Sequence, residues 1–231
     1  MTIDEFKQKN NTFFNNNALL EQAFIHRSFI NENPRTGLVH NERLEFLGDA
    51  VLELIVTEYL YTKYPHQNEG DLTAYRSALV NAVTLGELAS DLGFNDMIKL
   101  SKGEAKDIHR ARSSILADAY EAFIGAHYLD QGYASVKTFI TTTLLGKTED
   151  IIRKGLYKDA KSYVQEKAQE LYSFTPSYRV LSEEGPDHDK LFLIGIYFGE
   201  NKVAEGQGKS KQEAETAAAR SALIAKGWVT K

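Results

Sequence analysis

The sequence predicts an all-α domain followed by a small α+β domain with the element order α-β-β-β-α. Three observations lead to this prediction. At 231 residues the chain is longer than a typical single domain. Between Asn17 and Leu145 apolar residues recur at a spacing of three or four, and only Pro34 and Pro65 interrupt them. The remainder of the chain contains short strand-like runs between turns. The predicted parts are a helical domain at 1–146, a linker at 147–158 and a second domain at 159–231.

The first domain is expected to consist of helices joined by polar loops. The predicted helices are Asn17–Ile30, His40–Tyr64, Asp71–Ser90, Arg112–Asp130 and Tyr133–Leu145. The polar segments Asn31–Val39 and Lys99–Arg110 are predicted to be loops. The residues up to Asn17 are polar and rich in asparagine, which is not the pattern of a signal peptide.

The second domain is expected to begin after a tether. The segment 146–159 is charged and contains Gly146 and Gly155, a composition typical of a short tether. Beyond it we predict helices at Ala160–Tyr172 and Ser210–Lys226 and strands at Ser177–Glu184, Lys190–Phe198 and Lys202–Gly206. Turn sequences at 185–187 and 199–201 separate the strands, so a single antiparallel sheet is expected.

The composition excludes several classes of protein. The chain has no cysteine, which excludes disulfides, thiolate zinc sites and a thiol nucleophile and suits a reducing cytoplasm. Its apolar runs are much shorter than the roughly 20 residues that span a bilayer. We therefore expect a cytoplasmic protein with no membrane contact.

The charge is divided unevenly along the chain. The net charge of −5 by itself argues against a nucleic-acid partner. Up to Leu156 the chain carries 16 basic and 21 acidic residues, whereas the rest carries 11 of each. Any affinity for RNA must therefore come from local basic clusters and backbone dipoles.

Two carboxylates share one face of the helix predicted at His40–Tyr64. Glu45 and Asp49 are four residues apart, so only about 40° separates them around the helix axis. Nearly all their neighbours are apolar, which predicts a buried helix. Buried carboxylates are costly unless they are paired, hydrogen-bonded or bound to metal. Partners such as Arg43 and Arg76, or exposure at a helix end, would also explain one such pair.

A second predicted helix repeats this pattern. Asp118 and Glu121 are three residues apart in an otherwise apolar run, so they also share a face. Two helices that each bring two inward carboxylates would form a pocket of hard oxygen ligands. Because no cysteine or histidine cluster accompanies them, this ligand set favours Mg²⁺ or Mn²⁺ over zinc. The pattern alone supports a metal site and a structural role about equally.

Residues 41–50, Asn-Glu-Arg-Leu-Glu-Phe-Leu-Gly-Asp-Ala, resemble the signature sequence of the ribonuclease III family. Further matches follow the family's order. They are His26-Arg27-Ser28, Glu69-Gly70-Asp71-Leu72 with Arg76, and Asp118-Ala-Tyr-Glu121-Ala. The region after residue 159 resembles the double-stranded-RNA-binding domain of bacterial members. The resemblance thus covers nearly the whole chain.

This resemblance implies an endoribonuclease that hydrolyses double-stranded RNA. Glu45, Asp49, Asp118 and Glu121 match the family's catalytic, metal-binding carboxylates, and Glu121 is the most direct ligand. Two Mg²⁺ ions, for which Mn²⁺ can substitute, would polarise the scissile phosphate and activate a water. The products would carry 5′-phosphate and 3′-hydroxyl ends. The family's cellular role is the maturation of ribosomal and messenger RNA precursors.

The resemblance also implies accessory residues and a homodimer. Glu42 and Glu69 match accessory acidic positions that line the cleft. The family's signature helices meet at the dimer interface, and Phe46 stands where members insert an apolar side chain into the partner. Packing against a second subunit would explain why a helix that carries charges is otherwise so apolar.

Several residues of the second domain match the family's RNA contacts. A-form RNA is recognised through minor-groove 2′ hydroxyls and phosphates, which suits a polar helix face, a loop and a basic helix start. The matching residues are Gln165, Glu166, Gln169, His188, Lys209, Ser210 and Lys211. Gln212 and Glu215 stand where the family usually has basic residues. This departure predicts weaker binding with a flatter salt dependence.

Two other functions fit the sequence less well. A non-catalytic dimer that binds double-stranded RNA on the same fold is disfavoured, because all four carboxylates are present. A two-metal phosphoesterase for small substrates would leave the second domain without a role.

Overall fold

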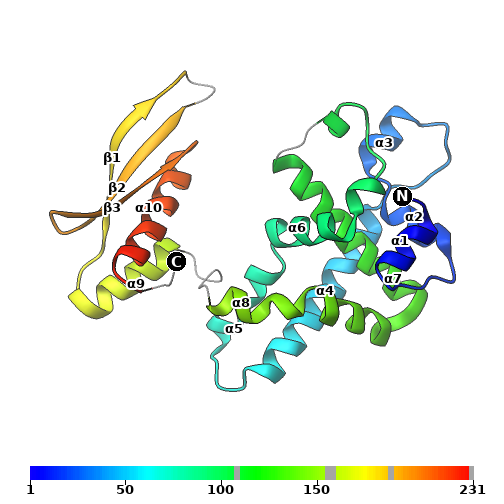
Figure 1. Cartoon of the computed structure of the whole chain (residues 1–231), viewed down its shortest axis with the longest axis horizontal. Helices are drawn as coiled ribbons and strands as arrows, with labels where there is room; N and C mark the ends of the chain where they lie inside the picture. Colours follow the sequence, from blue (N-terminus) through cyan, green and yellow to red (C-terminus); the bar gives the residue numbers. More distant parts are fainter. Residues whose placement is uncertain (107–109, 154–159, 187–189, 229–231) are drawn as a thin grey trace. The chain divides into compact units, whose positions relative to one another are not determined.

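The computed structural model describes residues 1–106, 110–153, 160–186 and 190–228. The chain divides into two compact units, Met1–Ile151 and Ile152–Lys231 (Figure 1). The first unit is helical and the second combines helices with a sheet, as the sequence predicts. Among the described residues, no helix combines the length and the apolar character needed to cross a membrane.

The helical unit is built around two long helices, α4 and α7. Its helices are α1 (Ile3–Lys9), α2 (Asn17–Ala23), α3 (Arg27–Glu32), α4 (Glu42–Lys63), α5 (Glu69–Leu79), α6 (Ala82–Leu92), α7 (Arg110–Thr143) and α8 (Thr148–Arg153). Short 3₁₀ turns lie at Phe94–Asp96, Glu104–Lys106 and Leu145–Lys147. Helix α4 is close to the prediction, because its apolar periodicity runs without interruption through the whole segment.

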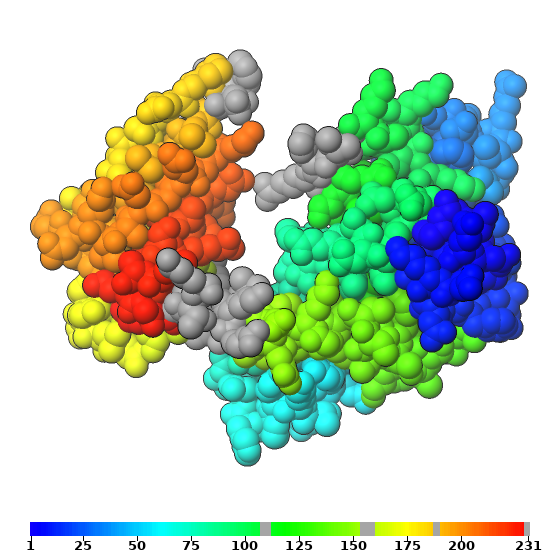
Figure 2. Space-filling view, in the orientation of Figure 1, coloured from blue at the N-terminus to red at the C-terminus, as the bar shows by residue number. Residues whose placement is uncertain are grey.

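The N-terminal helix α1 was not predicted. Thr2 and Glu5 form a reciprocal capping box that starts it, and Phe6 is fully buried. The Phe6 ring makes edge-on contacts with Phe24, Phe94 and Phe123. In Figure 2 the N-terminal segment, in blue, lies on the surface at one end of the helical unit. The Phe6 side chain therefore anchors α1 to the rest of the helical unit.

Two predicted helices are each broken in two. The helix expected at 17–30 stops at Ala23, because Ile25 forms a β-bridge with Lys99 and His26 caps the start of α3. The helix expected at 71–90 stops at Leu79, because the Asn81 side chain accepts hydrogen bonds from the first turn of α6. Both breaks depend on capping contacts that apolar periodicity does not reveal.

The region 110–153 is more helical than expected. The two helices predicted at 112–130 and 133–145 are the two segments of α7, which is kinked at Gly132 (φ +77°). Helix α8 lies inside the predicted linker, where Thr148 and Ile151 are buried and the Thr148 hydroxyl donates to the carbonyl of Leu145. The expected linker is thus helical up to Arg153, and residues 154–158 lie outside the described chain.

The second unit has the predicted element order. Its elements are α9 (Ala160–Tyr172), β1 (Ser177–Glu184), β2 (Leu191–Phe198), β3 (Asn201–Gly208) and α10 (Lys211–Ala225). The strands form one antiparallel sheet in the order β1-β2-β3, and both helices lie on the same side of it (Figure 1). The core between them contains Val164, Ala168, Ile196, Ala218 and Leu223. A Cβ atom on Gly206 would lie 2.1 Å from the Ala218 nitrogen, so only glycine allows β3 to approach α10 so closely.

Candidate active site in the helical domain

The site is formed where α4 and α7 cross. Their backbones approach so closely that a Cβ atom on Gly48 would lie 1.7 Å from the carbonyl oxygen of Glu121. Glycine at this position therefore brings the carboxylates of the two helices together.

Three of the four predicted carboxylates gather at this crossing. Glu45, Asp118 and Glu121 each offer an oxygen, and these oxygens all lie within 4.8 Å of one another. Each of the three residues is half-buried, so the group is open to a ligand from solvent. Such a set of oxygen donors fits a divalent cation of the Mg²⁺ or Mn²⁺ type.

The remaining acids near the site are more exposed. Asp49 is exposed and stands outside the group of three, although its charge raises the pKa values of Glu45 and Glu121. Glu42 is also exposed, and its carboxylate lies 3.2 Å from the Arg27 guanidinium. The charge of Glu42 acts on Glu45 as well. The structure thus places both residues at the edge of the acidic site.

The three gathered acids bind protons more tightly than ordinary carboxyl groups. Burial raises the pKa of Glu45 to about 7 and that of Glu121 to about 8, and the neighbouring carboxylates add to each shift. Burial also raises the pKa of Asp118. A bound cation would remove the cost of holding these groups in their charged form. The electrostatics of the site therefore favour a metal ion.

Glu69 lies elsewhere in the chain. It is at the start of α5 and accepts a hydrogen bond from the Thr73 hydroxyl. It lines a pocket of about 470 Å³ together with Thr57, Leu60, Tyr61, Gln67, Leu72, Thr73 and Arg76. Arg76, considered above as a partner for Glu45 and Asp49, donates instead to the Thr57 hydroxyl. Within one chain the structure therefore does not bring Glu69 to the acidic site.

One face of α4 is apolar and exposed. Phe46 is 82% exposed, Leu54 57% and Tyr61 75%, so the expectation of a helix buried on nearly every side was wrong for a single chain. Phe46, Leu54, Thr57 and Tyr61 follow one another at spacings of eight, three and four residues, so they fall on one side of the helix. Helix α4 thus buries one apolar face, which includes Leu52 and Ile55, and leaves a second apolar face exposed, with nothing from the described chain over it.

His26 has a structural role beside the site. Its Nδ1 accepts a hydrogen bond from the backbone N–H of Ser28 and so caps α3. The Ser28 hydroxyl lies 2.8 Å from the same nitrogen and accepts from the backbone N–H of Ser101. The charges of Asp118 and His26 influence each other. This network links α3 to the loop at 99–103, and the only sequence sign of it was the His-Arg-Ser match.

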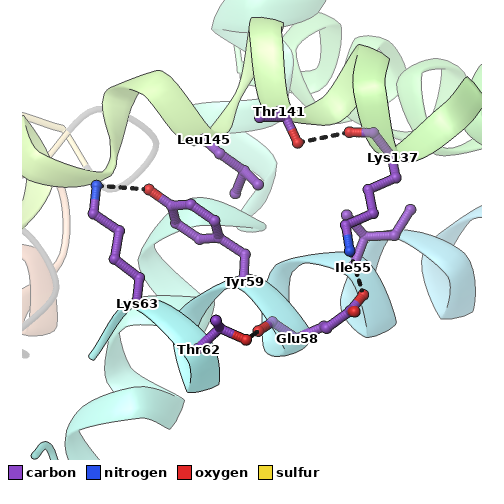
Figure 3. A pocket seen from close by; sticks show the side chains of 8 residues that line it. All are labelled: Ile55, Glu58, Tyr59, Thr62, Lys63, Lys137, Thr141 and Leu145. Carbon is purple, nitrogen blue, oxygen red and sulfur yellow. Dashed lines mark hydrogen bonds and ion pairs between the residues drawn. The ribbon is translucent and has the colours of Figure 1, made fainter. Parts of the chain in front are cut away.

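A second pocket lies on another side of α4. Its volume is about 280 Å³, and Figure 3 shows Tyr59 and Leu145 between two lysines. Lys63 bonds to the Tyr59 hydroxyl and to Glu149, and Lys137 pairs with Glu58 at 3.0 Å. These contacts join α4 to α7 and α8, so the charged side chains here serve the packing of the helical unit.

The predicted RNA contacts of the second unit are exposed, as far as they are described. The side chains of Gln165, Glu166 and Gln169 lie on the exposed side of α9. Lys209 and Ser210 precede α10, and the Ser210 hydroxyl accepts from the Glu213 backbone N–H. Lys211, in the first turn, is paired with Glu183 at 3.1 Å. His188 lies outside the described residues.

Comparison with known proteins gives matches over both units. The family model described as Ribonuclease-III-like matches residues 16–148, and the model described as double-stranded RNA binding motif matches residues 160–225. The protein named Ribonuclease 3 of Borreliella burgdorferi is 42% identical over 223 residues, covering 96% of this chain and 91% of its own. Ribonuclease 3 of Streptococcus pneumoniae (strain P1031) is 45% identical over 219 residues, covering 95% and 90%.

A solved structure resembles the helical unit. It is the nuclease domain of ribonuclease III from Campylobacter jejuni, with 39% identity and a TM-score of 0.55. The match covers 62% of this chain and 98% of that one. The structure is described in terms of flexibility in the region involved in dimer formation of that domain.

Proposed function

This chain belongs to the ribonuclease III family, and we propose that it cleaves double-stranded RNA by a two-metal-ion mechanism that leaves 5′-phosphate and 3′-hydroxyl ends. It is an endoribonuclease with a nuclease domain and a double-stranded-RNA-binding domain. Its proposed cellular substrates are ribosomal and messenger RNA precursors, and its proposed location is the cytoplasm.

The observation that carries the mechanism is the group of Glu45, Asp118 and Glu121. The family requires a divalent metal, and we propose Mg²⁺, with Mn²⁺ as a substitute. The three carboxylates would hold the metal, and Asp49 at the edge of the group would complete the set. When bound, the ions neutralise charge on the scissile phosphate and activate a water. In this scheme the carboxylates would position the ions more than they would transfer protons.

Homodimerisation is supported by two features of the helical unit. Phe46 is 82% exposed, and the pocket lined by Thr57, Tyr61 and Leu72 lies further along the same helix. Eleven residues separate Phe46 from Thr57, about 17 Å along an α-helix, so Phe46 is far from the pocket of its own chain. In a two-fold dimer a residue that contacts a site on the partner is matched by the reciprocal contact. Two antiparallel α4 helices would thus each insert Phe46 into the partner's pocket.

This arrangement also gives Glu69 a role. Glu69 lines the pocket, and Phe46 is adjacent to Glu45 in the chain. A partner pocket that receives Phe46 would bring the partner's glutamate toward the acidic site. Glu69 can therefore match an accessory acidic position although it does not reach the acidic site of its own chain, because it would act at the site of the partner.

The second domain is proposed to hold the RNA duplex. Gln165, Glu166 and Gln169 on α9 would contact minor-groove hydroxyls, and His188 would contact a second minor groove. Lys209, Ser210 and Lys211 would contact phosphate at the start of α10, where the helix dipole also favours an anion.

The direct test is gel analysis of a long RNA duplex incubated with the purified protein, with and without Mg²⁺. Wild-type protein should produce short duplexes only with Mg²⁺. Glu121→Gln should still bind the duplex and should cut it about 100-fold more slowly or worse, because several kcal/mol of charge stabilisation is lost. Glu87→Gln provides a matched control, because Glu87 is exposed on α6 and lies outside the group of three.

Two outcomes would contradict the proposal. If the wild-type protein binds the duplex but leaves it intact with both Mg²⁺ and Mn²⁺, the chain is a binding protein on a nuclease fold. If Glu121→Gln cuts as fast as Glu87→Gln, the carboxylate group does not hold the catalytic metal.

A further inference from the structure

We propose that Glu183 competes with RNA phosphate for Lys211 and thereby lowers the affinity of this chain for double-stranded RNA. The inference rests on the proposed function, in which Lys211 is a phosphate contact. The new element is that the Lys211 ammonium group already pairs with Glu183 of the same chain before RNA binds.

The contacts of Lys211 carry the inference. Its ammonium nitrogen lies 3.1 Å from a carboxylate oxygen of Glu183. The same nitrogen lies 5.6 Å from the centre of the Phe192 ring. The Lys211 side chain is 59% exposed and that of Glu183 37% exposed, so RNA could reach both. A phosphate at Lys211 would have to displace a carboxylate of the same chain or accept it as a neighbouring negative charge.

The sheet register fixes Glu183 on the side that carries α10. Glu183 pairs with Phe192, and Phe192 pairs with Gly208, so the three residues form one row across the sheet. A Cβ atom on Gly208 would lie 2.5 Å from the Ala214 nitrogen, which shows that this row faces α10. Glu183 is therefore held opposite the first turn of α10.

The local charge balance makes this contact important. Residues 157–231 carry 11 basic and 11 acidic side chains, so no general positive field compensates for a lost contact. Glu215 of α10, which stands where the family usually has a basic residue, pairs with Lys161 of α9 at 2.5 Å, so this position supplies no positive charge either. Exposed ion pairs are weak, so RNA can displace Glu183 at a cost that corresponds to a few-fold change in affinity.

The experiment measures the dissociation constant of the full-length protein for a duplex of about 16 base pairs or longer. A chelator is present so that no RNA is cut. Glu183→Gln should bind roughly two- to five-fold more tightly than wild type. Lys211→Met should bind more weakly, and the double variant should match Lys211→Met, because Glu183 acts only through Lys211.

Glu205→Gln is the matched control. Glu205 pairs with Lys202 at 2.9 Å and lies in the row of Gly195, which has the opposite orientation to Phe192 in β2. Glu205→Gln therefore makes the same charge change on the other face of the sheet. It should leave the dissociation constant close to that of wild type.

The outcomes separate this inference from the proposed function. If Lys211→Met binds as tightly as wild type, the proposed phosphate contact fails and the inference fails with it. If Lys211→Met weakens binding but Glu183→Gln has no effect or weakens it too, only the competition is overturned. An equal gain in Glu205→Gln would mean that net charge, not this ion pair, sets the affinity. Melting temperatures of all variants establish that each is folded.

Discussion

Gly48 of α4 and Gly125 of α7 stand directly opposite each other. A Cβ atom on Gly48 would lie 2.8 Å from the Gly125 nitrogen, and one on Gly125 would lie 3.1 Å from the Gly48 nitrogen and 2.1 Å from the Leu44 carbonyl oxygen. The close approach of the two helices thus lies next to the carboxylates, because Gly48 also meets the backbone of Glu121. The pair of glycines sets the separation on which the acidic site depends.

Gly125→Ala should damage both stability and activity. The added methyl group has to push α7 away from α4, because its nearest neighbours are backbone atoms. Overpacking of this kind should lower the free energy of unfolding by about 3 kcal/mol. Chemical denaturation measures this loss. RNA cleavage should fall as the acidic residues separate. Gly146→Ala is the control, since no atom lies within 4 Å of its added Cβ, and it should change stability by about 0.5 kcal/mol or less. Equal effects of the two substitutions would contradict the close-contact argument.

The metal-free protein should lose stability as the pH rises from 6.5 to 8. Folding raises the pKa of Glu45 to about 7 and of Glu121 to about 8, so in this range the folded state binds more protons than the unfolded state. A protein whose folded state binds more protons than its unfolded state becomes less stable as the pH rises. The lowered pKa of His127 acts in the opposite direction only below 6.5, outside this window.

Melting temperatures in the presence of a chelator test this prediction. Glu121→Gln should flatten the decline, because it removes the group with the highest of these pKa values. Mg²⁺ should also reduce it, since the metal binds the deprotonated carboxylates. A melting temperature that rises from pH 6.5 to 8 in the wild-type protein would show that folding does not raise the pKa values of these carboxylates.

Phe46→Glu should convert the proposed dimer into a monomer. A charge in place of an apolar side chain at the centre of an interface cannot be buried in the partner's pocket without a large desolvation cost. Sedimentation or light scattering gives the mass. Leu129→Glu is the control, because Leu129 is also exposed (54%) but belongs to α7, and it should leave the mass unchanged. A wild-type monomer at all concentrations would rule out this interface.

Gln212→Lys should strengthen RNA binding. Gln212 is exposed in the first turn of α10, where a lysine could contact the phosphate backbone. One added contact should steepen the dependence of log affinity on log salt concentration by about 0.9. Gln207→Lys makes the same charge change in β3, in the row of Leu193 and on the opposite face of the sheet, and should have little effect. A gain of equal size at both positions would reflect net charge alone.

Much of the fold could be predicted because its signals are local. Uninterrupted periodicity gave α4 nearly to the residue, and turn sequences separated the three strands. Helices α1 and α8 were missed, because each depends on a buried side chain, Phe6 or Ile151, whose burial is set by distant residues. The broken helix at 17–30 has the same cause, since the bridge of Ile25 to Lys99 is not visible in local sequence.

By itself the sequence determined which carboxylates share a helix face, because helix geometry fixes the angle between Glu45 and Asp49 from their spacing alone. Only the tertiary structure decided that Glu45 joins Asp118 and Glu121 while Asp49 stays exposed at the edge. It also decided that Phe46 is exposed and that Glu69 lies at a separate pocket. The reason is physical: spacing along one helix is fixed by covalent and hydrogen-bond geometry, whereas distances between helices depend on which surfaces pack, here through Gly48 and Gly125.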